Sequence, residues 1–249
     1  MRPLRIAARL AGLVGWLLAC LLLHGTWWLF GLHSPWPPRF LGGVAWICGV
    51  RARFSGPPSR GRVLIVANHC SWLDIMVIGG ATGAAFLAKA ELASVPLVGW
   101  LCRLNRTLFV DRADRRAIPR QVAETRAALE AGPVAIFPEG TTSDGRTLLP
   151  FKPALFQALD PPAPGVIVQP IFLEYGPAAP EIAWAEASGE DGIRNGLRIL
   201  GRPGTIPVAV RLLDPFDPAH VGDRKAISAE ARRRIVDAVR ANAARLEVA

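Results

Sequence analysis

Short apolar runs that end in polar clusters recur along the chain. Residues 63–67 are all apolar, and positions 68–74 then carry an amide, an imidazole, a hydroxyl and a carboxylate. Residues 133–137 form a second such run, and a polar loop over 138–145 follows it. A short buried run of this kind predicts a β-strand. Because α/β proteins do their chemistry at strand ends, we expect the two polar loops to converge on one crevice.

The other segments alternate between strand and helix patterns. Residues 119–131 predict an amphipathic helix, since a proline stands near the start and a Gly-Pro pair follows the end. The remaining predicted elements are helices over 75–80, after 148–153 and from Ser228, and strands over 84–88, 166–173 and 206–213. This alternation predicts a single α/β domain.

The N-terminal segment is strongly apolar. Residues 10–32 contain no Asp, Glu, Lys or Arg, and 23 helical residues at about 1.5 Å each would cross a hydrocarbon layer of about 30 Å. A secretory signal peptide would show small residues at a cleavage site after its apolar core, whereas this chain has His24, Trp27 and Trp28. We therefore expect the segment to be retained.

A break and a shorter apolar run follow. Residues 34–38, Ser-Pro-Trp-Pro-Pro, predict the break, and the run over 40–50 has eleven residues, too few to span a bilayer. Arginines flank these runs at both ends, and basic residues tend to stay on the cytoplasmic side. We predict a helix-break-helix hairpin in one leaflet in preference to a simple span. The expected division is a membrane-associating segment over 1–55 and a globular domain over 56–249.

The charge distribution agrees with a membrane partner. The formal net charge is +9, and residues 1–73 hold eight of the 29 basic residues and none of the 20 acidic ones. A basic segment joined to apolar runs favours an anionic bilayer surface, at about 1 kcal/mol per basic residue. Nucleic acid is the rival partner for excess arginine, and the adjoining apolar stretch argues against it. We expect the chain at the cell inner membrane, with its globular domain on the cytoplasmic face.

The first polar loop places a candidate base near a candidate carboxylate. Five positions separate His69 from Asp74, about 500° on a helix, so the two would share no helical face. They can meet if His69 lies in a turn and Asp74 in the helix that follows. The imidazole could then exchange a proton with a hydroxyl while the carboxylate fixes its tautomer. A lone histidine at a strand end is more often a capping or packing residue, but His69 alone among four histidines has a polar cluster around it.

The four cysteines, Cys20, Cys48, Cys70 and Cys102, lie far apart without Cys-x-x-Cys spacing. This pattern indicates neither a structural zinc site nor a disulfide framework, and we expect no metal. Cys70 is expected to be a small packing residue. A cysteine hydrolase that uses Cys70 and His69 is an alternative, disfavoured because adjacent residues rarely point their side chains at each other.

Four segments in sequence order carry a family resemblance. Residues 68–74 resemble the His-x-x-x-x-Asp motif of the glycerolipid acyltransferases, and Phe137-Pro-Glu-Gly-Thr141 resembles their Phe-Pro-Glu-Gly-Thr motif. Between them, Leu108-Phe-Val-Asp-Arg112 resembles the arginine motif of the family. Ile167-Val-Gln-Pro-Ile171 resembles its strand with a proline. The resemblance covers about residues 63–175 and implies one mixed-sheet α/β acyltransferase domain.

The resemblance implies acyl transfer from a thioester of acyl-carrier protein or coenzyme A, as co-substrate, to the free hydroxyl of a lysophospholipid, without a further cofactor. His69 would be the base that takes the hydroxyl proton, and Asp74 would orient it. Arg112 and Lys89 would bind the acceptor's phosphate. The other implied substrate-binding residues are Glu139, Gly140, Thr141 and Thr142.

The acceptor is predicted first as lysophosphatidic acid, which gives phosphatidic acid. Many members of the family continue the Glu-Gly-Thr motif with an arginine, whereas this chain has Thr142. The stretch over 140–152 also resembles the branch that acylates lyso-ornithine lipid, and this is the alternative acceptor. An alternative of another class is a non-catalytic lipid-binding protein with the same fold. The intact His69, Asp74 and Glu139 argue against it.

Overall fold

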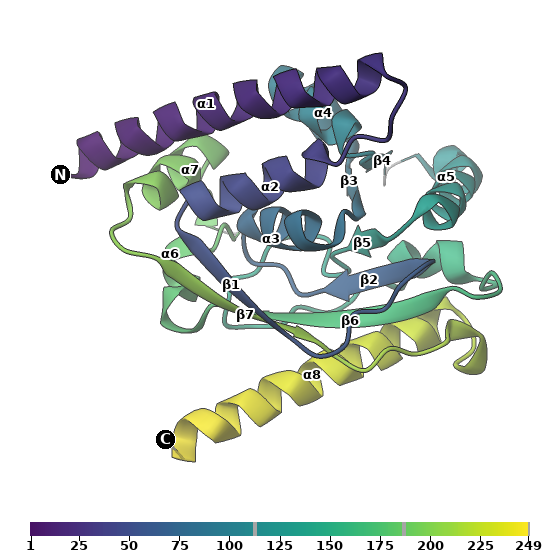
Figure 1. The fold of residues 1–249 in the computed structure, drawn as a ribbon. Helices are drawn as coiled ribbons and strands as arrows, with labels where there is room; N and C mark the ends of the chain where they lie inside the picture. The colour runs from purple at the N-terminus through teal and green to yellow at the C-terminus, as the bar shows by residue number, and fades with distance from the viewer. Residues whose placement is uncertain (112–113, 186–187, 249) are drawn as a thin grey trace.

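The computed structural model describes residues 1–111, 114–185 and 188–248. Figure 1 shows a central sheet between helices, with a long helix at each end of the chain. The strands are β1 Val50–Ser55, β2 Val63–Ala67, β3 Ala85–Lys89, β4 Leu108–Val110, β5 Val134–Ile136, β6 Ile167–Glu174 and β7 Ile206–Leu212. The α-helices are α1 Arg2–Leu29, α2 Trp36–Ile47, α3 Leu73–Thr82, α4 Pro96–Leu104, α5 Ile118–Ala131, α6 Ala179–Ile182, α7 Gly192–Gly201 and α8 Arg224–Val248. The 3₁₀ turns are η1 Ala90–Ser94, η2 Arg115–Ala117, η3 Pro153–Leu159, η4 Gly176–Ala178 and η6 Pro218–His220.

The strands form one sheet in the order β1-β7-β6-β2-β5-β3-β4. Strands β2, β3, β4, β5 and β6 run in one direction, and β7 is antiparallel to β6. Strand β1 pairs in parallel with β7, so these two run opposite to the other five. The predicted mixed-sheet α/β fold is confirmed. The carboxyl ends of β2, β5 and β6 lie at the same edge of the sheet.

Strand β2 is buried on both faces, and its alternate residues belong to two different cores. Val63, Ile65 and Ala67 pack in a cluster with residues of α2, α3 and α7. Leu64 and Val66 pack on the other face with residues of α5, η3 and α8. The fold is therefore a sheet with a helical layer on each side, and β2 lies between the two layers.

Helix α2 crosses α3 at close range. A Cβ atom on Gly80 of α3 would lie 2.6 Å from the Cα atom of Gly42, so only glycine allows this crossing. Leu41, Val44 and Ala45 of α2 are buried. The apolar run over 40–50, predicted as the second limb of a membrane hairpin, therefore packs largely against the domain, because its small residues let the two helices touch.

Helix α1 is anchored to the domain through its N-terminal arginines. The Arg9 guanidinium donates hydrogen bonds to the carbonyl oxygens of Ile199, Leu200 and Arg202 at the end of α7. Arg5 donates to the carbonyl oxygen of Gly201 at 2.8 Å. Cationic donors at a helix C-terminus satisfy its free carbonyls and its dipole. One face of α1 thus lies along the domain and does not project away from it.

The opposite face of α1 is apolar and exposed. Leu10, Val14, Leu18 and Leu22 repeat every fourth position and are 43%, 57%, 55% and 73% exposed. Of the helices described, α1 alone is long and apolar enough to cross a membrane. A non-helical segment over residues 30–35 follows α1, and helix α2 comes next. This is the predicted order of helix, break and helix.

Several predicted elements are confirmed within one or two residues, and others differ. The predicted helix after 148–153 is the 3₁₀ segment η3. Helix α8 begins four residues before Ser228, because Asp223 accepts the backbone N–H groups of Lys225 and Ala226. Residues 50–55, assigned to the N-terminal segment, form strand β1 along six residues of β7, so the globular fold begins before residue 56.

Candidate functional site

The two polar loops predicted to converge do meet at the carboxyl edge of the sheet. The loop after β2 and the loop after β5 are joined by a hydrogen bond from the Ser143 N–H to the carbonyl oxygen of His69, at 2.8 Å. Strand β6 lies on the other side of β2 and adds the residue that follows it, Tyr175. Three strands far apart in sequence thus supply one site.

His69 and Asp74 form a hydrogen-bonded pair. His69 Nδ1 lies 2.8 Å from Asp74 Oδ2. The chain turns after Ala67, and Asp74 is the second residue of α3, as the spacing required. The Asp74 side chain is fully buried, whereas the His69 side chain is 14% exposed. A proton on Nδ1 donated to Asp74 leaves Nε2, on the opposite edge of the ring, as the nitrogen that can accept a proton.

Four donors hold the carboxylate of Asp74. Its Oδ2 accepts the N–H groups of Cys70 and Ser71 at 2.8 and 3.0 Å, in addition to His69. Its Oδ1 accepts the hydroxyl of Tyr175 at 2.6 Å. Burial and the charge of Asp74 raise the pKa of Tyr175, so its hydroxyl stays a donor. A buried carboxylate needs such partners, and these fix its position.

The ring of His69 is held by stacking. It lies on Phe137 with ring centroids 3.9 Å apart and planes 14° from parallel. Phe137 in turn stacks beside Phe86 of β3 at 6.0 Å. The side-chain amide of Asn68 pairs with the backbone of Leu173: its Oδ1 accepts the Leu173 N–H at 2.8 Å, and its Nδ2 donates to the Leu173 carbonyl oxygen at 3.0 Å. The histidine loop is therefore tied to β3, β5 and β6 at once.

Glu139 joins the two loops from inside the fold. Its Oε1 accepts the backbone N–H of His69 at 2.7 Å, and its Oε2 accepts that of Leu149 at 2.8 Å. Glu139 is 2% exposed, so in this structure it is buried inside the fold. The resemblance instead implies a contact between Glu139 and the acceptor. Burial raises the pKa of Glu139 to about 7, although the two backbone N–H groups lower it. The structure thus makes Glu139 a clamp that holds the histidine loop.

The Glu-Gly-Thr loop turns at Gly140, whose φ of 72° favours glycine. The Gly140 N–H donates to the carbonyl oxygen of Phe137 at 3.0 Å and so closes the turn. The hydroxyl of Thr142 donates to the carbonyl oxygen of Trp184. Gly140 is buried, and Thr141 and Thr142 are half-buried at the site.

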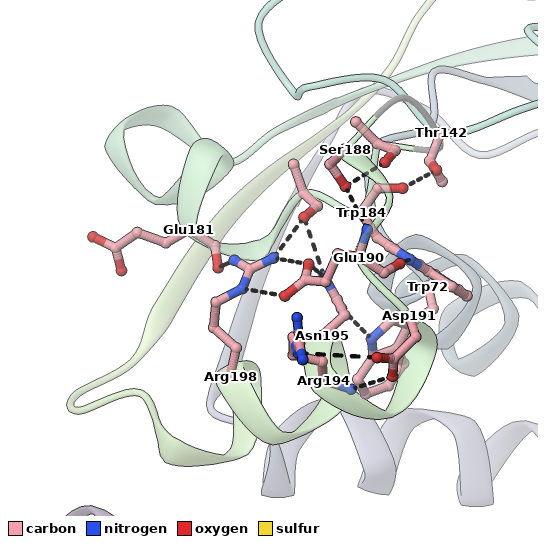
Figure 2. A network of polar contacts seen from close by, with 12 residues as sticks. Trp72, Thr142, Glu181, Trp184, Ser188, Glu190, Asp191, Arg194, Asn195 and Arg198 are labelled. Atoms are coloured by element: carbon pink, nitrogen blue, oxygen red, sulfur yellow. Dashed lines mark hydrogen bonds and ion pairs between the residues drawn. The ribbon is translucent and has the colours of Figure 1, made fainter.

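A polar network supports both loops from outside (Figure 2). Arg198 of α7 forms a bidentate ion pair with Glu190, at 2.6 and 3.0 Å. The backbone carbonyl of Glu190 accepts the indole N–H of Trp184 at 2.7 Å. The backbone of Trp184 contacts both site loops. Its carbonyl oxygen accepts the Thr142 hydroxyl, and its backbone N–H donates to the carbonyl oxygen of Cys70 at 2.8 Å.

Asn195 extends this network to the start of α3. Its Oδ1 accepts the indole N–H of Trp72 at 3.1 Å, and its Nδ2 donates to Glu190 at 2.9 Å. Asn195 is fully buried. Helix α7 therefore braces the turn that carries His69, and the same helix is held at its other end by Arg9 of α1.

The remaining predicted residues differ in position and burial. Lys89 is the half-buried last residue of β3. Arg112 lies outside the described residues. Cys70 is 2% exposed, and burial raises the pKa of its thiol, so it is a poor nucleophile. Over the described parts of the chain, no group of three or more His, Cys, Asp and Glu side chains could hold a metal ion.

Sequence reasoning did not find Tyr175, Trp184, Asn195 or Arg198. Tyr175 carried one signal, since it is the single tyrosine of the chain and follows the strand with a proline. The others act through contacts between α7 and the loops, and local sequence pattern does not report such contacts.

Comparisons with known proteins agree with the family resemblance. A family model described as Acyltransferase matches residues 52–174. A lyso-ornithine lipid O-acyltransferase of Brucella abortus is 36% identical over 77% of each chain. A 1-acyl-sn-glycerol-3-phosphate acyltransferase of Neisseria gonorrhoeae is 41% identical over 44% of each chain.

The fold also has a solved counterpart. The crystal structure of PlsC, the 1-acyl-sn-glycerophosphate acyltransferase of Thermotoga maritima, covers 98% of both chains with a TM-score of 0.61 and 22% identity. With the sheet, the histidine-aspartate pair and the Glu-Gly-Thr loop in place, the chain belongs to the glycerolipid acyltransferase family and is an acyltransferase.

Proposed function

We propose that the protein transfers a fatty acyl chain from a thioester to the hydroxyl of a lysolipid, with His69 as general base. The observation that carries this proposal is the His69 Nδ1 to Asp74 Oδ2 hydrogen bond of 2.8 Å. It leaves Nε2 as the proton acceptor of a ring that is held by Phe137 and partly open to solvent. This is the arrangement that activates a hydroxyl.

The reaction needs no acyl-enzyme. His69 Nε2 takes the proton of the acceptor hydroxyl as the hydroxyl oxygen attacks the thioester carbonyl. Asp74 stabilises the imidazolium that forms. When the tetrahedral intermediate collapses, the C–S bond breaks and His69 returns the proton to the leaving sulfur. The products are an ester and a free thiol, of coenzyme A or of acyl-carrier protein.

We propose lyso-ornithine lipid as the acceptor. The relative from Brucella abortus with that activity matches over 77% of its length, whereas the match to the Neisseria enzyme covers 44%. Position 142 is a threonine whose hydroxyl holds Trp184, not an arginine that would bind a phosphate. Both observations favour an acceptor without a phosphate monoester.

The surface beside the site supports this choice. An open pocket next to the Glu-Gly-Thr loop is lined by acidic and basic side chains, among them Asp144, Arg146, Glu190 and Arg194. The lining also includes Ala183 and Ala185, which flank Trp184, the residue whose backbone N–H donates to the carbonyl oxygen of Cys70 in the histidine loop. A head group that carries both an ammonium and a carboxylate, as an ornithine head group does, has partners of each sign there.

Lysophosphatidic acid is the second candidate. It is the acceptor named for the Neisseria relative. That relative is 41% identical to this chain over the 114 residues that match. Arg112 of the arginine motif would be its phosphate ligand, since an arginine fork matches phosphate oxygens.

We propose that α1 lies in one leaflet of the inner membrane, with the domain on the cytoplasmic face. Arg5 and Arg9 hold the N-terminal end of α1 on α7, and Trp16 donates to the carbonyl oxygen of Phe40 on α2 at 3.2 Å. With one face of the helix on the domain and the other apolar, an in-plane position buries the apolar stripe in lipid. The lysolipid acceptor then reaches the site without moving its acyl chain through water.

The test is an acceptor comparison with purified protein in detergent. Lyso-ornithine lipid and lysophosphatidic acid are offered in parallel with a coenzyme A or acyl-carrier-protein thioester, and product and free thiol are measured. We expect kcat/KM to be higher for lyso-ornithine lipid, and Arg194→Ala to raise its KM. Preference for lysophosphatidic acid would contradict the acceptor assignment, and thiol release without lipid product would contradict acyl transfer.

A further inference from the structure

Tyr175 donates a hydrogen bond to Oδ1 of Asp74, the carboxylate oxygen that does not bind His69. The residue follows the last residue of β6, and its hydroxyl lies 2.6 Å from Oδ1 of Asp74. Tyr175 is 3% exposed and packs in the same core cluster as Cys70 and Leu73. It therefore reaches the carboxylate from behind, on the side away from the partly exposed edge of His69.

The two oxygens of Asp74 thus have separate partners. Oδ2 accepts from His69 and from two backbone N–H groups of the histidine loop, whereas Oδ1 accepts from Tyr175. A carboxylate held at one oxygen alone can turn about its Cβ–Cγ bond, which tilts its plane away from its neighbour. With the phenol on Oδ1, such a turn would weaken the hydrogen bonds of both oxygens, so the phenol keeps one oxygen directed at His69 Nδ1.

We propose that Tyr175 is a positioning residue for the transfer reaction: its hydroxyl fixes the carboxylate of Asp74 toward His69. The inference rests on the proposed function, because it requires His69 to be the base. Tyr175 itself touches no reacting atom.

The same contact sets the basicity of the pair. The phenol donates a stronger hydrogen bond to Asp74 when His69 is neutral than when an imidazolium already offsets the carboxylate charge. Loss of the phenol would therefore weaken the pair more when His69 is neutral than when it is an imidazolium. The other charged or titratable groups that act on this cluster are Cys70, Glu139, Asp144 and Arg232. A substitution at position 175 replaces none of them.

The first test is Tyr175→Phe, which removes only the hydroxyl. Loss of one hydrogen bond to a charged group is expected to lower kcat roughly tenfold to a hundredfold, with KM little changed. The acid limb of the kcat/KM profile is expected to move to higher pH. Thr125→Val is the matched control, since Thr125 is also buried and its hydroxyl bonds within α5, at Gln121. It should leave both readouts unchanged.

The single tyrosine allows a second test that does not depend on the folding of a variant. Growth on 3-fluorotyrosine changes this one side chain into a stronger hydrogen-bond donor of nearly the same shape. The acid limb should then move to lower pH, opposite to its movement in Tyr175→Phe. A purely structural role for the ring predicts no such opposite shifts.

His69→Ala in the same assay separates the two proposals. If His69→Ala is inactive while Tyr175→Phe and the fluorinated protein keep the kcat and acid limb of the unmodified protein, the role of Tyr175 is refuted and the proposed function stands. If His69→Ala keeps its activity, the proposed base is wrong and the role of Tyr175 is refuted with it.

Discussion

Glu139 Oε1 accepts the backbone N–H of His69 at 2.7 Å, so the Glu-Gly-Thr loop holds the main chain of the proposed base. The other oxygen of Glu139 holds Leu149 in the same way. The motif residue that the family resemblance suggests as a substrate contact is buried in this structure, and its position gives it a mechanical role. The geometry of His69 then depends on Asp74 for its ring and on Glu139 for its backbone.

Glu139→Ala should destabilise the fold and impair catalysis together. It leaves the N–H groups of His69 and Leu149 without their acceptor, and each buried unpaired N–H costs about 1–3 kcal/mol. We expect the free energy of unfolding in urea to fall by about 2 kcal/mol or more. Glu124→Ala is the control, because Glu124 is 45% exposed and its ion pair with Arg120, at 3.8 Å, is long and solvent-exposed. Equal effects of the two substitutions would contradict the clamp.

The same residue gives a pH-dependent term in stability. The pKa of Glu139 is raised from its ordinary value of 4.5 to about 7, mainly because the carboxyl is buried. The folded state then holds this proton more tightly than the unfolded chain, so the contribution is present at low pH and is lost as the pH rises through about 7.

Urea unfolding at about pH 5 and about pH 8 measures that term. The unmodified protein should lose more free energy of unfolding over this interval than Glu139→Gln, which cannot titrate. Other titrating groups are common to both proteins and cancel in the comparison. A parallel decline in the two proteins would show that Glu139 keeps an ordinary pKa.

Arg198→Lys tests the support from α7. A lysine cannot reproduce the fork that binds both oxygens of Glu190, and we expect a loss of about 1–2 kcal/mol in stability. Hydrogen exchange at the Trp184 amide, which donates to Cys70, should become faster. Arg194→Lys should change stability by about 0.5 kcal/mol or less, since Arg194 is 80% exposed and 3.9 Å from Asp191. Unchanged exchange in Arg198→Lys would rule out this bracing.

The membrane position of α1 is tested by removing part of its apolar stripe. Leu18→Gln combined with Leu22→Gln takes two exposed leucines from the face that should enter lipid. We expect the affinity for anionic lipid vesicles to fall roughly tenfold or more, from the lost apolar burial. Phe54→Gln, which changes a 48% exposed residue on β1, should bind as the unmodified protein does. Equal binding by all three proteins would place the membrane contact elsewhere.

Local pattern was sufficient for the elements that surround the site. Strand β2 is a continuous apolar run, and the polar residues after it indicated the turn that brings Asp74 under His69. Strand β1 was not predicted, although Val-Arg-Ala-Arg-Phe-Ser alternates apolar and polar residues as a strand can, because these residues were assigned to the N-terminal segment. Five of its six residues are exposed, so burial gives no signal for it either. Pairing with β7, about 150 residues later, makes it a strand.

The residues that support the site could not be predicted from local pattern in the same way. Tyr175 meets Asp74 only because β6 pairs with β2, a contact between residues 101 positions apart. Helix α7 contains three glycines and is stabilised by Asp191 at its start and by Arg9 of α1 at its end. Motif spacing identified the reacting pair, whereas the residues that hold it are set by topology.

The most direct measurement of the central claim compares acyl transfer by His69→Ala and His220→Ala. Both substitutions remove an imidazole, but the His220 side chain is 85% exposed at the end of η6, and its Nδ1 lies 3.8 Å from Asp217 Oδ2. With lyso-ornithine lipid and an acyl thioester, His220→Ala should keep the unmodified rate and His69→Ala should lose at least about two orders of magnitude in kcat. Acyl transfer by His69→Ala at the rate of His220→Ala would contradict His69 as the base.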